Sequence, residues 1–362
     1  MAKKFFRQPR EGSSVKIEIV SKYFSAWSNV IKNWRNDKFL FMDLFAGPGI
    51  YEDGTHSIPI KVLQSVMDDE QKRKKFLGIF NEVDDELRSQ LKTNIESIEG
   101  YNILQNSPVI ENIPVDHSLT NYLESIKLVP TLLFIDPWGY KGLSLKLIGS
   151  VIKNRGCDCI FFFNYNRVNA ALSNPAFEEG WVKEILGEEK TEVIRQVIES
   201  KEGFEREKEI MSLVREVLQS YGGLHTFFMR FKQEKSDKTS HFLILTSSNP
   251  LAHEIIKDIA FKKATDYIKA LDAYEFDPKK SRQLKLWEIA NIDDLGHDLL
   301  KRFKGEEMKM KEIFYKHHIG TPYVKKHYKQ ALLKLEVEGK VGVKEPRRKG
   351  TIGDDKYVKF KT

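Results

Sequence analysis

Acidic side chains and glycines follow apolar runs at several points of the sequence, and these are the residues that could do chemistry. Asp43 ends the run FLFMD, and the turn after it contains Gly47 and Gly49. Glycine lets the backbone approach a ligand closely, and the carboxyl ends of parallel strands are where such ligands bind. The turn lacks the third glycine of a dinucleotide fingerprint. Taken alone, it is equally consistent with a ligand site and with a plain structural turn.

A second acidic residue, Glu82, ends the run FLGIFNE and is placed to accept hydrogen bonds from a ribose. It follows Asp43 by 39 residues, more than the roughly 20 of a compact βαβ unit. The loop YEDGTHS accounts for the difference. The alternative is that Glu82 supplies negative charge to the next helix, which Asp84 and Asp85 could do equally well. We favour the ribose role.

The third candidate position is YNILQNS, which we expect to be a strand that ends at Asn106 and Ser107. An amide there could hold the amino group of an adenine. Pro108 interrupts the stretch directly afterwards. This is the weakest of the predicted ligand contacts.

The fourth apolar run, TLLFID, leads into Asp136, Pro137 and Trp138, with Tyr140 two residues further on. Pro137 prevents the run from continuing as a central strand. The pattern suits a site that methylates an amine, because the carboxylate can accept a hydrogen bond from an amino group and a flat ring can stack on the base that carries it. The alternative is that Trp138 and Tyr140 only cover the end of the sheet.

The elements that must position these residues alternate along the chain. After a leading amphipathic helix at 15–34, we expect strands at 38–47, 74–84, 101–107, 131–136 and 157–166. Helices are expected between them at 57–69, 85–98, 117–128 and 144–154. Such alternation predicts a parallel sheet covered on both faces. Runs at 224–233 and 240–248, joined by a polar turn, predict an antiparallel hairpin at its end, and a helix at 250–268 follows.

The C-terminal end has a different pattern. Residues 305–362 contain 15 Lys or Arg and 8 Asp or Glu, whereas the remaining residues carry 44 of each sign. Helices at 308–318 and 321–339 precede two short strands around the basic tip 347–355, with Thr321 and Pro322 expected to start the second helix. This order predicts a winged helix-turn-helix, which presents its second helix to a duplex groove and its wing to the backbone.

The expected phosphate contacts lie on the second helix and on the wing tip of this module. They are Lys325, Lys326, Lys329, Arg347, Arg348 and Lys349. Clustered basic residues indicate a nucleic-acid partner. The alternative is a winged helix used for protein pairing.

Composition excludes other classes of protein. No apolar segment approaches the roughly 20 residues that span a bilayer, so we expect no membrane association. Cys157 and Cys159 are the only cysteines, which fits a reducing cytoplasm and a packing role. His317, His318 and His327 lack metal-ligand spacing, so we expect surface histidines and no metal.

The segments YFSAW…FLFMDLFAGPGIYEDG and LLFIDPWGYKGLS resemble the three-Cys-motif partner proteins. Those proteins are in turn similar to class I methyltransferases that use S-adenosylmethionine. The resemblance covers roughly residues 15–265 and implies a Rossmann-like methyltransferase fold. It also implies roles for individual residues: Asp43, Phe45, Gly47 and Gly49 around the methionine part of the cofactor, Glu82 on its ribose, and Asp136 with Pro137 at the reacting centre. A radical-chemistry protein with a three-cysteine motif is the implied partner.

The predicted organisation is an N-terminal helical segment at 1–35 and a methyltransferase-like domain at 36–270 with a helical insertion at about 166–221. A connector at 271–304 and the winged helix at 305–362 follow. The predicted function is methyl transfer from S-adenosylmethionine to an amino group of a nucleic-acid base. The alternatives are a non-catalytic nucleic-acid-binding subunit of a larger radical or defence system and, third, a metal-dependent nuclease built on Asp43, Glu82 and Asp136.

Overall fold

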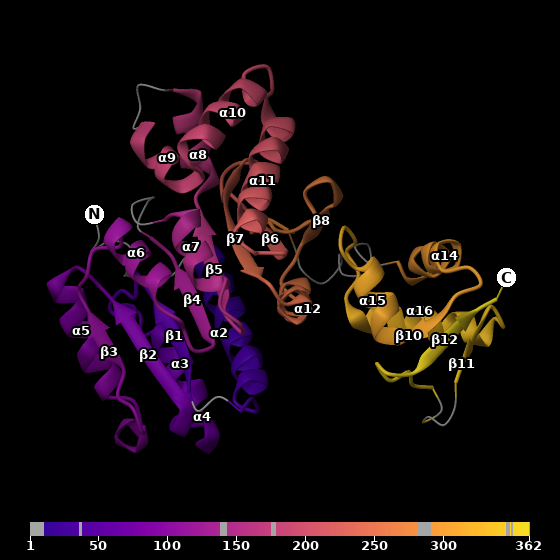
Figure 1. The fold of residues 1–362 in the computed structure, drawn as a ribbon, viewed down its shortest axis with the longest axis horizontal. Helices are drawn as coiled ribbons and strands as arrows, with labels where there is room; N and C mark the ends of the chain where they lie inside the picture. Colours follow the sequence, from indigo (N-terminus) through magenta and orange to yellow (C-terminus); the bar gives the residue numbers. More distant parts are fainter. Residues whose placement is uncertain are drawn as a thin grey trace. The chain divides into compact units, whose positions relative to one another are not determined.

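The computed structural model divides into two compact units, Met1–Ile259 and Ala260–Thr362, which are drawn in Figure 1. It describes residues 11–35, 38–137, 143–174, 179–280, 291–344, 348 and 350–361.

The first unit is built on a mostly parallel sheet. Its strands are β1 (Phe39–Asp43), β2 (Phe76–Asn81), β3 (Val109–Glu111), β4 (Thr131–Ile135), β5 (Asp158–Phe163), β6 (His225–Lys232) and β7 (Thr239–Ser247). Their order is β3-β2-β1-β4-β5-β7-β6. The first five are parallel, and β7 runs antiparallel to both β5 and β6. The predicted α/β fold, with a mostly parallel sheet and an antiparallel hairpin at its end, is confirmed.

Helices before, between and after these strands cover the sheet. They are α2 (Glu11–Ile31), α3 (Ile58–Met67), α4 (Glu70–Lys75), α5 (Asp85–Glu96), α6 (His117–Ser125), α7 (Leu145–Ile152) and α12 (Pro250–Phe261). The leading helix α2 packs on the sheet, because the ring of Phe24 meets those of Phe41 and Phe76 edge-on at 5.4 and 6.2 Å between centroids. The buried face of α2 therefore belongs to the same core as the strands.

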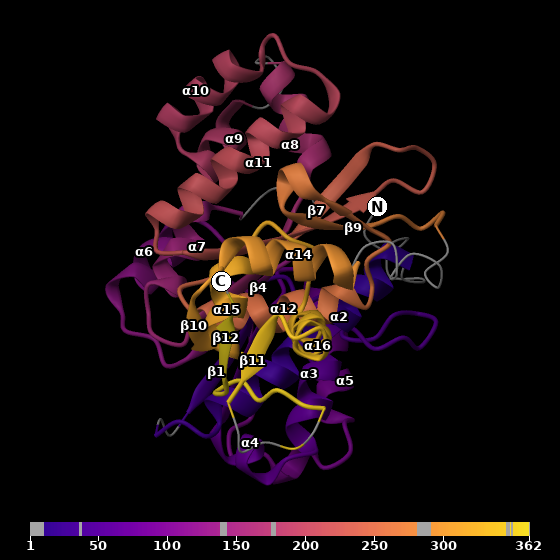
Figure 2. The same ribbon diagram turned by 90° about the vertical axis from the view of Figure 1, so that its right-hand side faces the viewer.

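The helical insertion gathers at one end of the sheet, in the upper part of Figures 1 and 2. It consists of α8 (Tyr165–Ser173), α9 (Glu179–Leu186), α10 (Glu188–Ile198) and α11 (Gly203–Ser220). Glu207 of α11 accepts hydrogen bonds from Arg230 of β6 at 2.7 and 3.0 Å and from Thr239 of β7 at 2.8 Å. These three buried side chains anchor the insertion to the β6–β7 hairpin.

The third strand differs from the prediction. Residues Tyr101–Ile103 form a 3₁₀ turn after Gly100, whose φ is 78°, and the strand β3 begins only at Val109. Pro108 has no N–H to donate to a sheet, so pairing starts after it. The strand predicted at 101–107 was therefore wrong, and Asn106 and Ser107 precede the strand rather than end it.

The second unit contains a winged helix. Its elements are β8 (Asp266–Ile268), η2 (Lys269–Leu271), β9 (Ala273–Phe276), α14 (Ile292–Arg302), β10 (Glu307–Lys309), α15 (Met310–His317), α16 (Lys325–Val337), β11 (Val341–Val343) and β12 (Tyr357–Phe360). An antiparallel sheet in the order β10-β12-β11 completes the module.

Two features of this unit differ from the predicted pattern. The expected connector contains β9 and helix α14, and Gly296 of α14 lies against Leu335 of α16, so α14 is the first helix of the winged helix. Helix α16 begins at Lys325 rather than after Thr321, because the Thr321 hydroxyl donates to the carbonyl oxygen of His318 at 2.9 Å.

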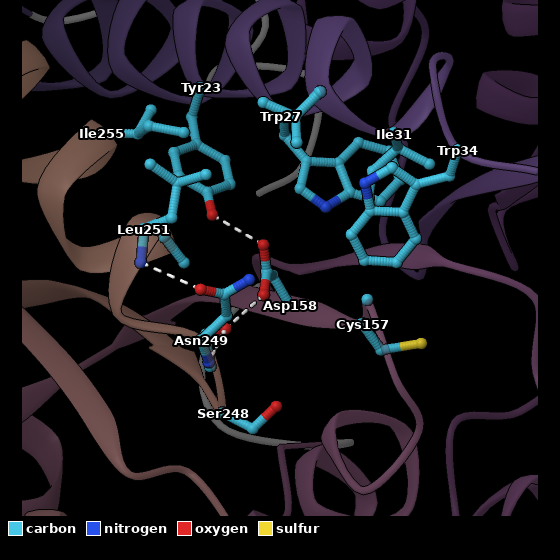
Figure 3. Close-up of a pocket in the computed structure, with 14 residues that line it drawn as sticks. Tyr23, Trp27, Ile31, Trp34, Cys157, Asp158, Ser248, Asn249, Leu251 and Ile255 are labelled. Atoms are coloured by element: carbon cyan, nitrogen blue, oxygen red, sulfur yellow. Dashed lines mark hydrogen bonds between the residues drawn. The ribbon is translucent and has the colours of Figure 1, made fainter. Parts of the chain in front are cut away.

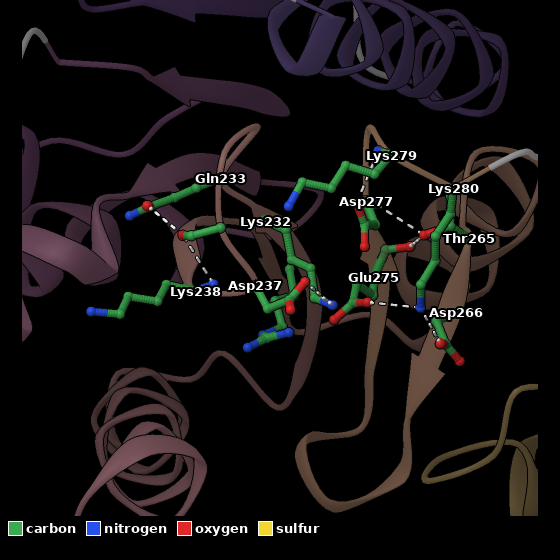
Figure 4. Close-up of polar contacts among 12 residues, drawn as sticks. Lys232, Gln233, Asp237, Lys238, Thr265, Asp266, Glu275, Asp277, Lys279 and Lys280 are labelled. Atoms are coloured by element: carbon green, nitrogen blue, oxygen red, sulfur yellow. Dashed lines mark hydrogen bonds and ion pairs between the residues drawn. The ribbon is translucent and has the colours of Figure 1, made fainter.

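The β8–β9 hairpin is held by polar contacts, which Figure 4 shows. The Lys280 ammonium lies 2.9 Å from Asp266 and 3.8 Å from the buried Glu275. The Thr265 hydroxyl donates to the Glu275 carbonyl at 3.1 Å and accepts from the Asp277 N–H at 2.9 Å. These contacts hold the open end of the hairpin, where β8 begins and β9 ends.

Candidate functional site

Three carboxylates meet at the carboxyl edge of the first unit's sheet. Asp43 is the last residue of β1, Glu82 follows β2, and Asp136 follows β4. Since β1 lies between β2 and β4 and all three are parallel, these strand ends are neighbours. The structure therefore brings together the acids that the sequence placed at separate strand ends.

Glu82 fixes the glycine turn that follows β1. Its carboxylate accepts from the N–H of Gly47 and from the N–H of Asp84, each at 3.0 Å. Gly47 and Gly49 have φ values of 64° and 84°, which favour glycine. At Gly49 a Cβ atom would also lie only 3.1 Å from Leu91. The turn is thus held in one conformation by its own backbone and by Glu82.

Asp43 is buried beneath this turn, with 1% of its surface exposed. Its carboxylate accepts from the N–H of Phe45 at 3.0 Å, and the Phe45 residue is half-buried. Burial raises the pKa of Asp43 to about 8, with Asp136 and Glu82 adding to the rise and the Phe45 N–H and Lys16 opposing it. Asp43 is therefore a carboxyl group that titrates near neutral pH.

Lys16 of α2 is the residue at this edge that the sequence analysis missed. Its ammonium forms an ion pair with Oδ2 of Asp136 and lies 4.6 Å from the centre of the Phe162 ring. The side chain is 6% exposed, against 24% for Asp136. The signal in the sequence was a lysine at the head of an apolar helical stripe that continues through Val20, Tyr23 and Trp27.

A double-mutant cycle should show that Lys16 and Asp136 are coupled. The substitutions Lys16→Met and Asp136→Asn, combined in one chain, should destabilise it by about 0.5–3 kcal/mol less than the sum of the single changes. Each single change leaves the partner without its counter-ion in a site with little access to water. Urea unfolding of the four proteins gives the coupling free energy, and strict additivity would contradict the ion pair.

The structure places the other predicted site residues of the first unit differently. Pro137 directly follows Asp136 in the described chain, whereas Trp138 lies outside the described residues. Asn106 donates to the carbonyl oxygen of Phe76, the first residue of β2, at 3.2 Å. That position is the amino end of β2, opposite to the end that Glu82 follows. The predicted contact of Asn106 and Ser107 with an adenine amino group therefore finds no support in this geometry.

A small cavity also lies at the amino end of the sheet (Figure 3). It has a volume of about 30 Å³, close to the share of one water molecule in the liquid. Asp158 at its wall accepts from the Tyr23 hydroxyl at 2.7 Å and from the Ser247 hydroxyl. Burial raises the pKa of Asp158 to about 6 against the lowering effect of these two donors. We read this cluster as a buried structural network, remote from Asp43 and Asp136.

The three lysines of α16 that were predicted to contact nucleic acid are engaged within the second unit. Lys325 and Lys329 both bind Asp354, at 2.8 and 2.7 Å. Lys326 lies 4.9 Å from the centre of the Phe261 ring. Arg348 is exposed, while Arg347 and Lys349 lie outside the described residues.

Two of the three histidines expected at the surface are buried. His318 is 2% exposed and stacks on Phe314 with 4.2 Å between the ring centres. His327 is 5% exposed, and its Nδ1 accepts from the N–H of Val324 at the start of α16. Their role is to pack and cap the winged helix. Across the part of the chain that is described, no three His, Cys, Asp or Glu side chains are grouped to hold a metal ion.

The described helices include none that is long and apolar enough to cross a membrane.

Comparison with known proteins adds a family for the second unit. A family model for the GMT-like wHTH domain matches residues 261–347. This match confirms the winged helix and leaves the resemblance to three-Cys-motif partner proteins a hypothesis. A search of curated proteins found no match.

Several of the solved structures similar to the chain are methyltransferases, at low similarity. The DszA carbon methyltransferase is 10% identical, with 67% of this chain and 56% of that chain covered and a TM-score of 0.40. Protein LPL1258 from Legionella pneumophila is 11% identical, with 67% and 87% covered and a TM-score of 0.36. The plantazolicin methyltransferase BamL, solved with SAH, is 13% identical, with 68% and 90% covered and a TM-score of 0.32. The chain thus spans little more than half of the first of these proteins, and such scores carry no argument about its activity.

Proposed function

We propose that the chain is an S-adenosylmethionine-dependent methyltransferase that acts on an amino group of a nucleic-acid base. The observation that carries the proposal is the meeting of Asp43, Glu82 and Asp136 at the carboxyl edge of a methyltransferase-like sheet, next to a glycine turn. In open α/β sheets this edge is where ligands bind.

The charges at this edge fit the proposed cofactor. Asp43, Glu82 and Asp136 supply three carboxyl groups, and Lys16 supplies one cation through its ion pair with Asp136. S-adenosylmethionine carries a sulfonium and an ammonium group with one carboxylate, so its net positive charge complements a net negative site. Asp43 would hold the ammonium group and Glu82 the ribose hydroxyls, while Gly47 and Gly49 keep the backbone close to the methionine part.

The cofactor supplies an electrophilic methyl group, and the protein has to align the acceptor with it. Oδ2 of Asp136 binds Lys16, and we assign Oδ1 to the acceptor amino group. A hydrogen bond from that group to the carboxylate orients the nitrogen lone pair and provides a destination for its proton. The carbonyl oxygen of Pro137 is the second acceptor that we assign to the amino group.

The nucleic-acid part of the proposal rests on the winged helix. The module matches the GMT-like wHTH family model and carries the excess of basic residues. Such modules hold nucleic acid mainly through phosphate contacts, which position it without reading its sequence. We propose that this unit supplies the affinity and the first unit the chemistry.

Calorimetry first tests whether the protein binds the cofactor. S-adenosylmethionine and S-adenosylhomocysteine should both bind, and Glu82→Gln should weaken both, because Glu82 fixes the turn and faces the ribose. Absence of heat with both compounds would end the proposal. Mass spectrometry of nucleosides from cells with and without the protein then identifies the modified base.

Asp43 should make cofactor binding depend on pH. With a pKa of about 8, Asp43 is about 1% ionised at pH 6 and about 10% at pH 7. The ligand-free protein holds the proton and the complex releases it, so the affinity should rise close to tenfold over this interval. Titration of S-adenosylhomocysteine at the two pH values measures the change. Asp43→Asn should bind weakly with no such rise, and a pH-independent affinity of the unaltered protein would contradict the assignment.

A second candidate function is a non-catalytic nucleic-acid-binding subunit, with a three-cysteine-motif protein as its partner. The ion pair between Lys16 and Asp136 favours it, because the ammonium occupies part of the position that an acceptor amine would need. Stable co-purification with a partner, without methyl transfer by the complex, would support this alternative.

A further inference from the structure

The outer face of the three-stranded sheet in the second unit has a composition that the winged-helix pattern does not require. Met308, Val358 and Phe360 point inward and are buried. The outward positions form what we call the Tyr357 face. It consists of Glu307, Lys309, Gly342, Lys344, Tyr357 and Lys359.

Tyr357 lies between two lysines on this face. Lys309 is its partner in β10, and Lys344, on the other side, donates its N–H to the Tyr357 carbonyl at 3.0 Å. The ammonium groups of Lys309 and Lys344 lie 5.6 and 5.1 Å from the centre of the ring. The residue nevertheless keeps 41% of its surface exposed. An aromatic ring is therefore presented to solvent with a cation on each neighbouring strand.

The next set of paired residues across the three strands leaves space beside the Tyr357 ring. Lys359 is paired across the sheet with Glu307 on one side and Gly342 on the other. A Cβ atom added to Gly342 would meet nothing within 4 Å, so no side chain of the described residues packs directly on the sheet there. The three lysines outnumber the single acid Glu307, which binds Lys344. The face is accordingly positive, flat and partly bare.

The lysines of α16, the helix expected to enter a duplex groove, are less available to bind phosphate. Lys325 and Lys329 of α16 are both bound to Asp354, so a phosphate would have to displace that carboxylate. On the sheet, Lys359 is exposed and Lys309 is half-buried. Among the described residues, neither forms an ion pair as close as those of Lys325 and Lys329 with Asp354. Aromatic rings on exposed sheets stack on the unpaired bases of single strands, while neighbouring cations hold the backbone.

We propose that the Tyr357 face binds single-stranded nucleic acid, with one base stacked on Tyr357 and with Lys309 and Lys359 on the flanking phosphates. This inference rests on the proposed nucleic-acid function and names the form of substrate that the module takes. A base in a single strand is already unpaired, so its amino group needs no extraction from a duplex before transfer.

Fluorescence anisotropy with the full chain tests the proposal. The probes are a fluorescein-labelled 12-nucleotide oligothymidylate and a 12-base-pair DNA duplex, without cofactor. Tyr357→Ala should weaken binding of the single strand by roughly 5- to 150-fold, the equivalent of about 1–3 kcal/mol for one stacked base. Tyr357→Phe keeps the ring and should bind as the unaltered chain does. Tyr122→Ala, at an exposed tyrosine of α6 in the first unit, is the matched control and should have no effect.

The lysines provide a second measurement. The change Lys309→Gln with Lys359→Gln should flatten the plot of log affinity against log salt by about 0.7 for each lost single-strand contact. Unchanged single-strand affinity in Tyr357→Ala, or an equal loss in Tyr357→Phe, would overturn the proposal. So would an unchanged slope in the lysine variant. Methyl transfer is not part of either measurement, so a failure here and a failure of the proposed enzyme activity are distinguishable.

Discussion

Asp136→Asn should lower the rate of methyl transfer by at least about 100-fold, within the range that a positioned acid or base contributes. Binding of S-adenosylhomocysteine should stay within about threefold, because Asp43 and Glu82 rather than Asp136 are assigned to that ligand. Asparagine keeps the shape of the side chain but replaces one acceptor oxygen by a donor, so it cannot accept both Lys16 and the amino group of the base. Transfer of tritiated methyl groups to total cellular RNA and to genomic DNA measures the rate, and calorimetry measures the affinity.

The matched control for this experiment is Asp116→Asn. Asp116 caps α6 by accepting from the N–H groups of Ser118 and Leu119, and asparagine caps a helix about as well. Its activity should therefore be unaltered. If Asp136→Asn transferred methyl groups within threefold of the unaltered chain, Asp136 would not be the acceptor's partner. Activity lost together with cofactor binding would instead indicate that the carboxylate serves the cofactor.

The parts of the site that were predictable are those that follow from local sequence. Asp43, Glu82 and Asp136 each end an apolar run, and the alternation of strands with helices makes the sheet parallel, so their meeting at one edge follows from the fold class. The glycine turn was visible because Gly47 and Gly49 directly follow a strand. No long-range contact had to be known for these conclusions.

The parts that could not be predicted depend on contacts between distant segments. Lys16 reaches Asp136 across 120 residues, and only the packing of α2 on the sheet aligns them. Asn106 lies in a run with the composition of a strand, but Pro108 cannot donate a backbone hydrogen bond, so strand pairing begins after it, at Val109. Helix α14 was hidden in a segment of mixed composition, because its burial comes from α16 and not from its own sequence alone.

Asp354→Asn should tighten binding of duplex DNA and steepen its salt dependence. The substitution removes the carboxylate that binds Lys325 and Lys329 at 2.8 and 2.7 Å, and both ammonium groups then become available to phosphates. Two added contacts steepen the log–log slope by up to about 1.8, which makes the affinity lost between 50 and 200 mM salt roughly tenfold larger. Anisotropy of the 12-base-pair duplex across this salt range measures the slope.

Asp355→Asn is the matched control, because Asp355 binds Lys311 at 2.8 Å and contacts no lysine of α16 among the described ion pairs. Its slope with duplex should change by no more than about 0.9, the value for one contact. The 12-nucleotide single strand gives the decisive comparison. If it binds on the Tyr357 face, Asp354→Asn should affect the duplex far more than the single strand. A large and equal gain in affinity for both probes would place the single strand on α16 as well. No gain for the duplex would mean that Lys325 and Lys329 do not contact nucleic acid even without Asp354. That result would favour a winged helix that pairs with protein.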